Sequence, residues 1–288
     1  MSKKFICCES DFDDAKIVLF GVPYDATSTY RKGSRLAPAA IRKESIGIET
    51  FSPYSDRDLA DIKVYDFGDL KRLKDIEDML HSVESTVDDA LNHNKFPVML
   101  GGEHLVTLGA FKAIHKKYPD VCIIHFDAHT DLRDNWDGQK LNHSTVIRRC
   151  HDVIASEAKQ SSQSSPRIFQ FGIRSGERTE FEWAKQNTHL CRHNFATLKD
   201  AIKQIGNRPV YFTIDLDVLD PSEMGGTGTP EAGGVSFLEL LDATQKVFGL
   251  NVVGCDINEL SPPYDCNGAS TALACKFLRE VLLLCQKH

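Results

Sequence analysis

Residues 121–131 read Val-Cys-Ile-Ile-His-Phe-Asp-Ala-His-Thr-Asp, an apolar run that ends in alternating acidic and imidazole side chains. Several other short apolar runs in the chain also end in a polar or glycine-rich cluster. Such continuous β-branched and aromatic runs are typical of strands that are covered on both faces, as in a parallel sheet. The expected strands are 16–20, 96–100, 121–126, 168–171, 210–214 and 251–257.

Helical patterns separate the expected strands. Apolar residues recur at three- and four-residue spacing over 75–92 and 105–117. The capping box Ser236-Phe-Leu-Glu239 opens a further helix, and 270–286 is expected to form the last one. This alternation predicts an α/β fold, namely a single domain over residues 1–288 built as a three-layer α/β/α sandwich with a mostly parallel central sheet. Within it, the Ser/Gln-rich segment 151–166 is predicted to be an exposed surface loop.

The composition excludes several classes of protein. Hydrophobic residues make up 41% and charged residues 26% of the 288 residues, as in an ordinary soluble globular protein. Since 34 Lys and Arg face 41 Asp and Glu, the net charge of −7 argues against nucleic-acid or membrane partners. No apolar run reaches the length of about 18 residues that would suggest a membrane span. Nine scattered cysteines without a CxxC pair are typical of reduced thiols, which predicts a cytoplasmic location.

Acidic and imidazole side chains gather at the ends of three expected strands. In an open parallel sheet, ligands bind beyond the carboxyl ends of the strands. A lone Asp-x-Asp there is more often a cap or turn, and a lone histidine after two glycines is more often structural. Their joint occurrence is harder to explain by packing and predicts one converging group of side chains. Its members are His104, Asp127, His129, Asp131, Asp215 and Asp217.

The donor types in this group predict a binuclear metal site. Four carboxylates packed together would repel one another and raise their pKa values unless a cation lay between them. Carboxylate and imidazole donors without a thiolate favour a harder ion such as Mn²⁺ over structural zinc. Six ligands are too many for one catalytic ion that keeps an open position, so two ions are expected.

Five ordered motifs, with an amino-terminal segment, carry a family resemblance. They are 101–104 (GGEH), 126–133 (FDAHTDLR), 213–221 (TIDLDVLDP), 227–234 (TGTPEAGG) and 256–262 (DINELSP), preceded by 21–25 and 33–38. In this order they resemble the ureohydrolase (arginase–agmatinase) family, and within it most closely the agmatinases. The similarity extends from Ile17 to Leu284 and is interrupted at the Ser/Gln-rich segment.

The resemblance implies an arginase-like fold with two Mn²⁺ per subunit. His104, Asp127, Asp131 and Asp215 would hold one ion, and Asp127, His129, Asp215 and Asp217 the other, with Asp127 and Asp215 bridging. A hydroxide shared by the two ions would attack the guanidinium carbon of the substrate. The catalytic residues implied by the family are Asp131, Glu259, which pairs with the guanidinium, and His143, which carries a proton to the leaving amine. Without the resemblance, Glu259 and His143 would be taken for turn and surface residues.

The expected reaction is hydrolysis of a small cationic guanidino substrate, foremost agmatine to putrescine and urea. The loop 131–140 lacks the Asn/Thr/Ser-rich run that binds the amino-acid end of arginine in arginases, and Asp134 or Asp137 are candidates for the distal ammonium. The alternatives are another ureohydrolase acting on guanidinobutyrate or a related guanidino acid, a single-zinc deacetylase, and an inactive binding protein. The family also implies a homo-oligomer, either a trimer or a hexamer.

Overall fold

An eight-stranded sheet runs through the centre of the computed structural model, which describes residues 4–157 and 166–285. The strand order is β4-β1-β5-β10-β9-β6-β7-β8, and each pair of neighbours is parallel. The strands are β1 (Ile17–Gly21), β4 (Val64–Asp69), β5 (Phe96–Leu100), β6 (Cys122–Phe126), β7 (Ile168–Ile173), β8 (His189–Arg192), β9 (Val210–Asp215) and β10 (Val252–Asn258). A separate antiparallel pair is formed by β2 (Phe51–Ser52) and β3 (Arg57–Asp58).

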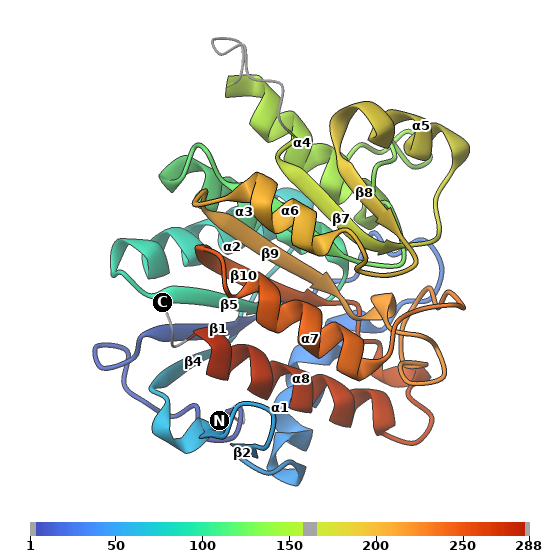
Figure 1. Cartoon of the computed structure of the whole chain (residues 1–288). Helices are drawn as coiled ribbons and strands as arrows, with labels where there is room; N and C mark the ends of the chain where they lie inside the picture. The colour runs from blue at the N-terminus through green and yellow to red at the C-terminus, as the bar shows by residue number, and fades with distance from the viewer. Residues whose placement is uncertain (1–3, 158–165, 286–288) are drawn as a thin grey trace.

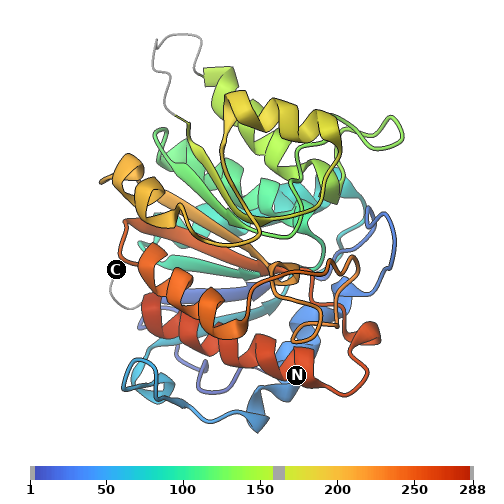
Figure 2. The same cartoon turned by 45° about the vertical axis from the view of Figure 1, so that its right-hand side comes forward.

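Helices cover both faces of the sheet (Figures 1 and 2). One apolar core packs α2, α3, α4 and α5 on one face, and a second core packs α1, α6, α7 and α8 on the other. These helices are α1 (Ala37–Glu44), α2 (Ile76–Asn92), α3 (Thr107–Lys117), α4 (Val146–Glu157), α5 (Arg178–Asn187), α6 (Leu198–Ile205), α7 (Phe237–Val247) and α8 (Ala269–Cys285). The predicted α/β fold, a three-layer α/β/α sandwich with a parallel central sheet, is therefore confirmed.

The central strands are apolar because both of their faces are covered. Every residue of β6 and β9 is buried, and the predicted bounds of these strands differ from the observed ones by one residue at most. The capping box of α7 forms as expected, with the Ser236 hydroxyl and the Glu239 carboxylate satisfying backbone N–H groups of the first turn. The extent of a single domain over all of 1–288 stays a prediction, since its termini lie outside the described residues.

The prediction of a loop over 151–166 is wrong for its first part. Residues 151–157 continue α4, which begins at Val146. Ile147, Cys150 and Ile154 are buried at helical spacing, so the apolar face of this helix begins before the Ser/Gln-rich segment and extends into it. Residues 158–165 lie outside the described part of the chain.

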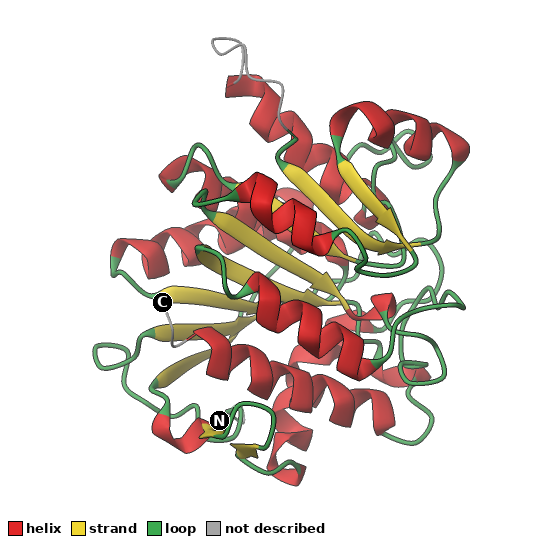
Figure 3. Cartoon of the chain, in the orientation of Figure 1, coloured by secondary structure: helices red, strands yellow, loops and turns green. Residues whose placement is uncertain are grey.

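All the strands end at the same edge of the sheet, as their arrowheads in Figure 3 show. The strands β5 and β6 are consecutive in the chain, with only α3 and the short 3-10 turn before it between them. In the sheet, however, β10 and β9 lie between these two strands. The loops after β5 and β6 diverge around this position, which is a topological switch point where a crevice opens. Among the described residues, no helix is long and apolar enough to cross a membrane.

Candidate metal centre

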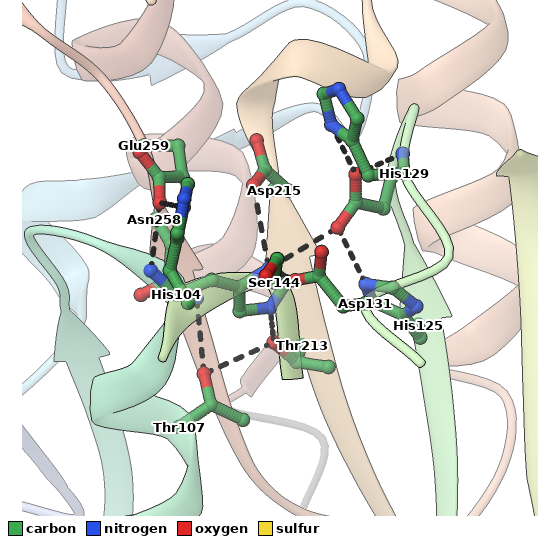
Figure 4. A network of polar contacts seen from close by, with 12 residues as sticks. His104, Thr107, His125, His129, Asp131, Ser144, Thr213, Asp215, Asn258 and Glu259 are labelled. Atoms are coloured by element: carbon green, nitrogen blue, oxygen red, sulfur yellow. Dashed lines mark hydrogen bonds and ion pairs between the residues drawn. The ribbon is translucent and has the colours of Figure 1, made fainter. Parts of the chain in front are cut away.

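The predicted ligands meet at this switch point. Asp127 follows β6 directly, and Asp215 is the last residue of β9. His104 begins a short 3-10 helix that leads from β5 into α3. Figure 4 shows His104, Asp131, Asp215 and His129 close together in this region, although they come from three separate segments of the chain. The segments that carry the predicted ligands therefore lie together at this edge of the sheet.

Two glycines allow the chain to turn from β5 toward His104. A Cβ on Gly101 would lie 1.8 Å from Asn258 Oδ1, and a Cβ on Gly102 would lie 2.0 Å from the carbonyl oxygen of Tyr24. No side chain fits at either position, so the backbone passes directly against its neighbours. The turn is held there because the amide of Glu103 donates to Tyr24 O at 2.8 Å.

One group of donors surrounds His104. Its Nδ1 lies 3.2 Å from Asp127 Oδ2, 3.2 Å from Asp131 Oδ2 and 3.3 Å from Asp215 Oδ2. This nitrogen is buried, and in the described structure it has no hydrogen-bond partner of acceptable geometry. A buried nitrogen that faces three carboxylates without hydrogen-bonding them is the arrangement expected where a cation completes the group.

A second group shares Asp127 with the first. His129 Nδ1 lies 3.0 Å from Asp217 Oδ2 and 3.4 Å from Asp127 Oδ1. The donor atoms of Asp127, His129 and Asp217 all lie within 4.8 Å of one another, as do those of His104, His125, Asp127 and Asp131. Asp127 therefore reaches both groups with its two oxygens. Asp215 belongs to neither of these two groups, although it lies close to His104.

The charges in the centre are strongly perturbed. Burial, together with the carboxylates of Asp217 and Asp127, raises the pKa of Asp215 well above its usual value. Burial likewise raises the pKa of Asp217 against the opposing effect of His129. Burial lowers the pKa of His104, but the surrounding aspartates outweigh it and raise this pKa well above its usual value. Each effect is the response of crowded, desolvated charges, which a divalent cation would relieve.

The residues present fit a pair of divalent ions. Oxygen and imidazole donors without sulfur suit a hard or borderline cation, and two groups with a common carboxylate suit two ions close together. All six predicted ligands lie in or beside these two groups. Their individual assignment, including Asp215 as a second bridge, stays a prediction.

Side chains outside the donor groups orient His104. Its Nε2 lies 2.8 Å from Thr213 Oγ1, and the Thr213 hydroxyl donates to Asp256 Oδ1 at 2.6 Å. The Thr213 oxygen thus accepts the proton of Nε2, which leaves the Nδ1 lone pair facing the centre. Asp256 also accepts hydrogen bonds from Thr107 and Asn258, so it is fixed in turn. Such relays are common behind metal-binding histidines and set their ring orientation.

The two predicted catalytic residues outside the ligand groups lie in contact. Glu259 Oε1 accepts the amide N–H of His104 at 2.8 Å and lies 3.3 Å from His143 Nδ1. His143 Nε2 accepts the amide N–H of Thr29 at 3.1 Å, so the ring proton stands on Nδ1 and points to Glu259. Burial lowers the pKa of His143, but Glu259 and the nearby acidic groups more than offset this and raise it. His143 and Glu259 are both buried, contrary to the turn and surface roles that the residues alone suggested.

A cavity of about 270 Å³ opens from this centre to solvent. It is lined by His129, Asp131, His143 and Asp215 of the centre, by the partly or fully exposed Arg133, Trp136 and Glu177, and by the buried Glu180. The Arg133 guanidinium stacks on Trp136 and forms ion pairs with Glu177 and Glu180. Neither Asp134 nor Asp137, the two candidates for the distal ammonium, is among the residues that line this cavity, and Arg149 lies 3.2 Å from the Asp134 carboxylate.

Sequence reasoning missed the residues behind the ligands. The motifs contain Thr213 and Asp256 without indicating a role for either, and no pattern in the sequence points to Thr29 or His125. Glu103 also belongs here, since it accepts the amide and hydroxyl of Thr27, and burial raises its pKa to about 7. One signal was available: polar residues inside a strand that is otherwise buried, such as Asp256 in β10, require a partner.

Comparison with known proteins agrees with this geometry. An agmatinase from Bacillus cereus is 46% identical to this chain, with 98% of the chain and 96% of that protein covered. The crystal structure of the agmatine ureohydrolase of Thermoplasma volcanium matches with a TM-score of 0.87 at 34% identity, covering 99% of this chain and 94% of the other. A guanidinobutyrase from Pseudomonas aeruginosa is 32% identical to this chain, with 95% of the chain and 87% of that protein covered. The arginase family model matches residues 15–284, and the chain therefore belongs to the arginase family.

Proposed function

We propose that this enzyme hydrolyses agmatine to putrescine and urea at a pair of manganese ions. The observation that carries the proposal is the buried Glu259–His143 contact beside the two donor groups, because it combines a carboxylate for a guanidinium with a proton carrier. The agmatinase from Bacillus cereus, at 46% identity over nearly the whole chain, supports the choice of substrate.

Glu259 is the residue that we expect to bind the guanidinium. A planar cation and a carboxylate can share two parallel, charge-assisted hydrogen bonds. The amide of His104 holds Glu259 Oε1, so the carboxylate is oriented before the substrate arrives. A guanidinium bound by Glu259 would lie beside the donor group around His104, whose backbone amide contacts the same carboxylate. When bound by these groups, two manganese ions supply the attacking nucleophile, because they lower the pKa of water toward neutrality.

His143 supplies the proton that the reaction requires. Attack by water on the guanidinium carbon gives a tetrahedral adduct, and the bond to the substituted nitrogen then breaks to release urea and an amine. The attacking water loses a proton and the departing amine must gain one, so His143 would take up the first proton to become an imidazolium and return one from Nδ1, which lies beside the carboxylate that binds the guanidinium. Thr29 prevents the opposite tautomer, because its amide occupies Nε2.

The mouth of the cavity favours a substrate with a cationic tail. Glu177 and the buried Glu180 outnumber Arg133, which is the one lysine or arginine side chain that lines this cavity. The carboxylate of a guanidino acid would need Arg133, whose guanidinium is already paired with both glutamates and stacked on Trp136. The second candidate substrate, guanidinobutyrate, is supported by the 32% identical guanidinobutyrase, and it would have to displace these contacts.

The test is urea release by the purified enzyme after chelation and readdition of single metals. Agmatine, guanidinobutyrate and arginine are compared at equal concentration, with Mn²⁺, Zn²⁺ or no metal added. We expect agmatine to give the highest kcat/KM and Mn²⁺ to restore the most activity. Faster turnover of either other substrate would contradict the proposed substrate, and full activity without metal would contradict the proposed centre.

We also propose that the enzyme is a cytoplasmic homo-oligomer, either a trimer or a hexamer. The nine free thiols are typical of a reducing compartment, and the oligomer rests on the family resemblance alone. Analytical ultracentrifugation at micromolar concentration tests the oligomeric state, and a monomer would contradict it.

A further inference from the structure

A fully buried histidine, His125, contacts the carboxylate that both donor groups share. Its Nε2 lies 2.7 Å from Asp127 Oδ2. On the other side of the ring, Nδ1 lies 3.0 Å from Nε2 of Gln170, its register partner on β7. His125, Asp127 and Gln170 each have no exposed surface. Figure 4 shows His125 on the β6 side of the network, with a dashed line joining it to the shared carboxylate.

The hydrogen bonds of Gln170 determine which nitrogen of His125 carries the proton. The Gln170 amide nitrogen donates to the carbonyl oxygen of Thr130 at 2.7 Å. A carbonyl only accepts, so the group that faces it is NH₂ and not the amide oxygen. The same NH₂ group lies against His125 Nδ1, which must therefore accept with its lone pair. The proton then stands on Nε2 and is donated to Asp127.

The amide of Gln170 has this orientation although its own oxygen forms no hydrogen bond in it. Oε1 of Gln170 is buried and accepts no hydrogen bond in the described structure. Turning the amide around would satisfy no more groups, because it would direct an oxygen at the carbonyl of Thr130. The two hydrogen bonds of the NH₂ group thus stabilise this orientation more than the unsatisfied oxygen destabilises it. This indicates that Gln170, on β7, sets the tautomer of His125.

By position alone, His125 could also be a metal ligand. One of its nitrogens lies within 4.8 Å of donor atoms of His104, Asp127 and Asp131. A ligating imidazole nitrogen must offer a lone pair, however, and Nε2 carries a proton while the lone pair of Nδ1 is occupied by Gln170. The backbone amide of His129 holds Asp127 Oδ1, so both oxygens of the shared carboxylate are oriented by fixed donors.

We propose that His125 is a positioning residue for Asp127, with its tautomer set by Gln170, and that it is not a metal ligand. This inference rests on the proposed metal centre but not on the identity of the substrate. Outer partners of metal ligands typically contribute about 10- to 100-fold to metal affinity. Loss of the His125 donor should therefore weaken manganese binding without removing a ligand.

The first measurement is the tautomer of His125 in the metal-free protein, read from ¹⁵N–¹H correlation spectra of histidine-labelled enzyme. We expect protonation on Nε2 in the wild type and loss of this fixed tautomer in Gln170→Leu. A wild-type ring protonated on Nδ1 would overturn the proposal.

The second measurement is manganese binding by calorimetry, with EPR of the bound ions. His125→Phe should bind Mn²⁺ roughly 10- to 100-fold more weakly. His125→Gln, whose amide nitrogen reaches about as far as Nε2 of the ring and can still donate to Asp127, should recover part of that affinity, and kcat should change more than KM. Unchanged affinity in His125→Phe, or loss of one whole ion with no recovery in His125→Gln, would overturn the proposal.

Two controls keep the outcomes separate. His81→Asn changes an exposed histidine on α2 and should bind manganese like the wild type. If circular dichroism shows that His125→Phe does not fold, Gln170→Leu decides the question through the tautomer spectra, because it retains the ring and removes the contact that fixes its proton, together with the hydrogen bond to Thr130 O. A wild type that binds two Mn²⁺ but does not hydrolyse agmatine would contradict the proposed function and leave this inference intact.

Discussion

Two residues of the centre adopt backbone conformations that side chains usually avoid. Asp131 has φ of 51° and Glu259 has φ of 66°, in the left-handed region. Neighbouring groups hold both in place: the carbonyl of Asp131 accepts the amides of Ile147 and Arg148 at the start of α4, and the amide of Glu259 donates to Gly102 O. Such conformations persist where the surroundings impose them, and they are concentrated at functional sites.

At the scale of one residue, Glu259→Gln should remove the charge that binds the guanidinium. The glutamine oxygen can still accept the amide of His104, so the fold should be preserved. Replacing a charged acceptor costs about 1.5–3 kcal/mol, which corresponds to a roughly 10- to 150-fold loss in kcat/KM for agmatine. Urea release measures this loss, with Glu182→Gln, an exposed carboxylate on α5, as the matched control. Equal kcat/KM in both variants would show that Glu259 does not bind the substrate.

At the scale of elements, prediction from the sequence succeeded where a segment is buried on both faces. The strand β5 has the predicted bounds because an apolar run ends at two glycines. The edge strands β4 and β8 were missed, since β4 alternates buried and partly exposed residues and β8 has only four residues. The candidate ligands could be singled out because each lies at the end of a strand or in the short segment that follows it. The contact of Gln170 with His125 could not, because it depends on the register of β6 and β7, which no local pattern reveals.

The turn after β5 should not tolerate a side chain at Gly102. In Gly102→Ala the new Cβ would meet the backbone oxygen of Tyr24, which cannot rotate away. Overpacking of this kind costs about 1–3 kcal/mol in the free energy of unfolding and should also displace His104 and weaken metal binding. Urea denaturation and manganese titration measure the two effects. Gly47→Ala, where the new Cβ meets nothing within 4 Å, should leave both unchanged, and similar behaviour of the two variants would contradict this account.

Asp220 ties the segment after β9 to the loop that leads into α7. Its Oδ1 accepts the amide and hydroxyl of Ser222, and its Oδ2 accepts the amides of Gly233 and Gly234. These hydrogen bonds, with that of the Ser222 hydroxyl the largest, lower the pKa of Asp220 well below its usual value. Because the pKa is lowered on folding, the stabilisation is present above the unfolded pKa of about 3.9 and is lost as the pH falls toward the folded value.

Asp220→Asn should therefore lower the free energy of unfolding by about 1 kcal/mol, a small value because the side chain is partly exposed. Urea denaturation of the chelated protein should show this difference unchanged from pH 7 to pH 5 and narrowing below about pH 4. Asp242→Asn on α7, an exposed carboxylate paired with Lys246, is the control and should have little effect at any pH. A difference that grows in acid would contradict the assigned role of the Asp220 charge.

At the scale of the whole molecule, the centre joins segments that are far apart in the chain. Its donors follow β5, β6 and β9, and Glu259 follows β10, so the four central strands meet at one group of charges. Each of these strands is packed between the two apolar cores, so the donors cannot separate without loss of packing. In the metal-free protein the fold must hold crowded, desolvated carboxylates together, and burial raises the pKa of both Asp215 and Asp217. Metal binding and global stability should therefore be coupled.

Addition of Mn²⁺ to the chelated enzyme should accordingly raise its melting temperature. A ligand at 100 times its dissociation constant stabilises the native state by about 2.7 kcal/mol, and each kcal/mol shifts Tm by about 2–4 °C in a chain of this size class. We expect a rise of roughly 5–10 °C by calorimetry. In Asp217→Asn the rise should shrink, because His129 loses the carboxylate 3.0 Å from its Nδ1, whereas Asp242→Asn should keep it. An unchanged Tm in the wild type, or the same rise in both variants, would mean that these carboxylates do not hold a metal.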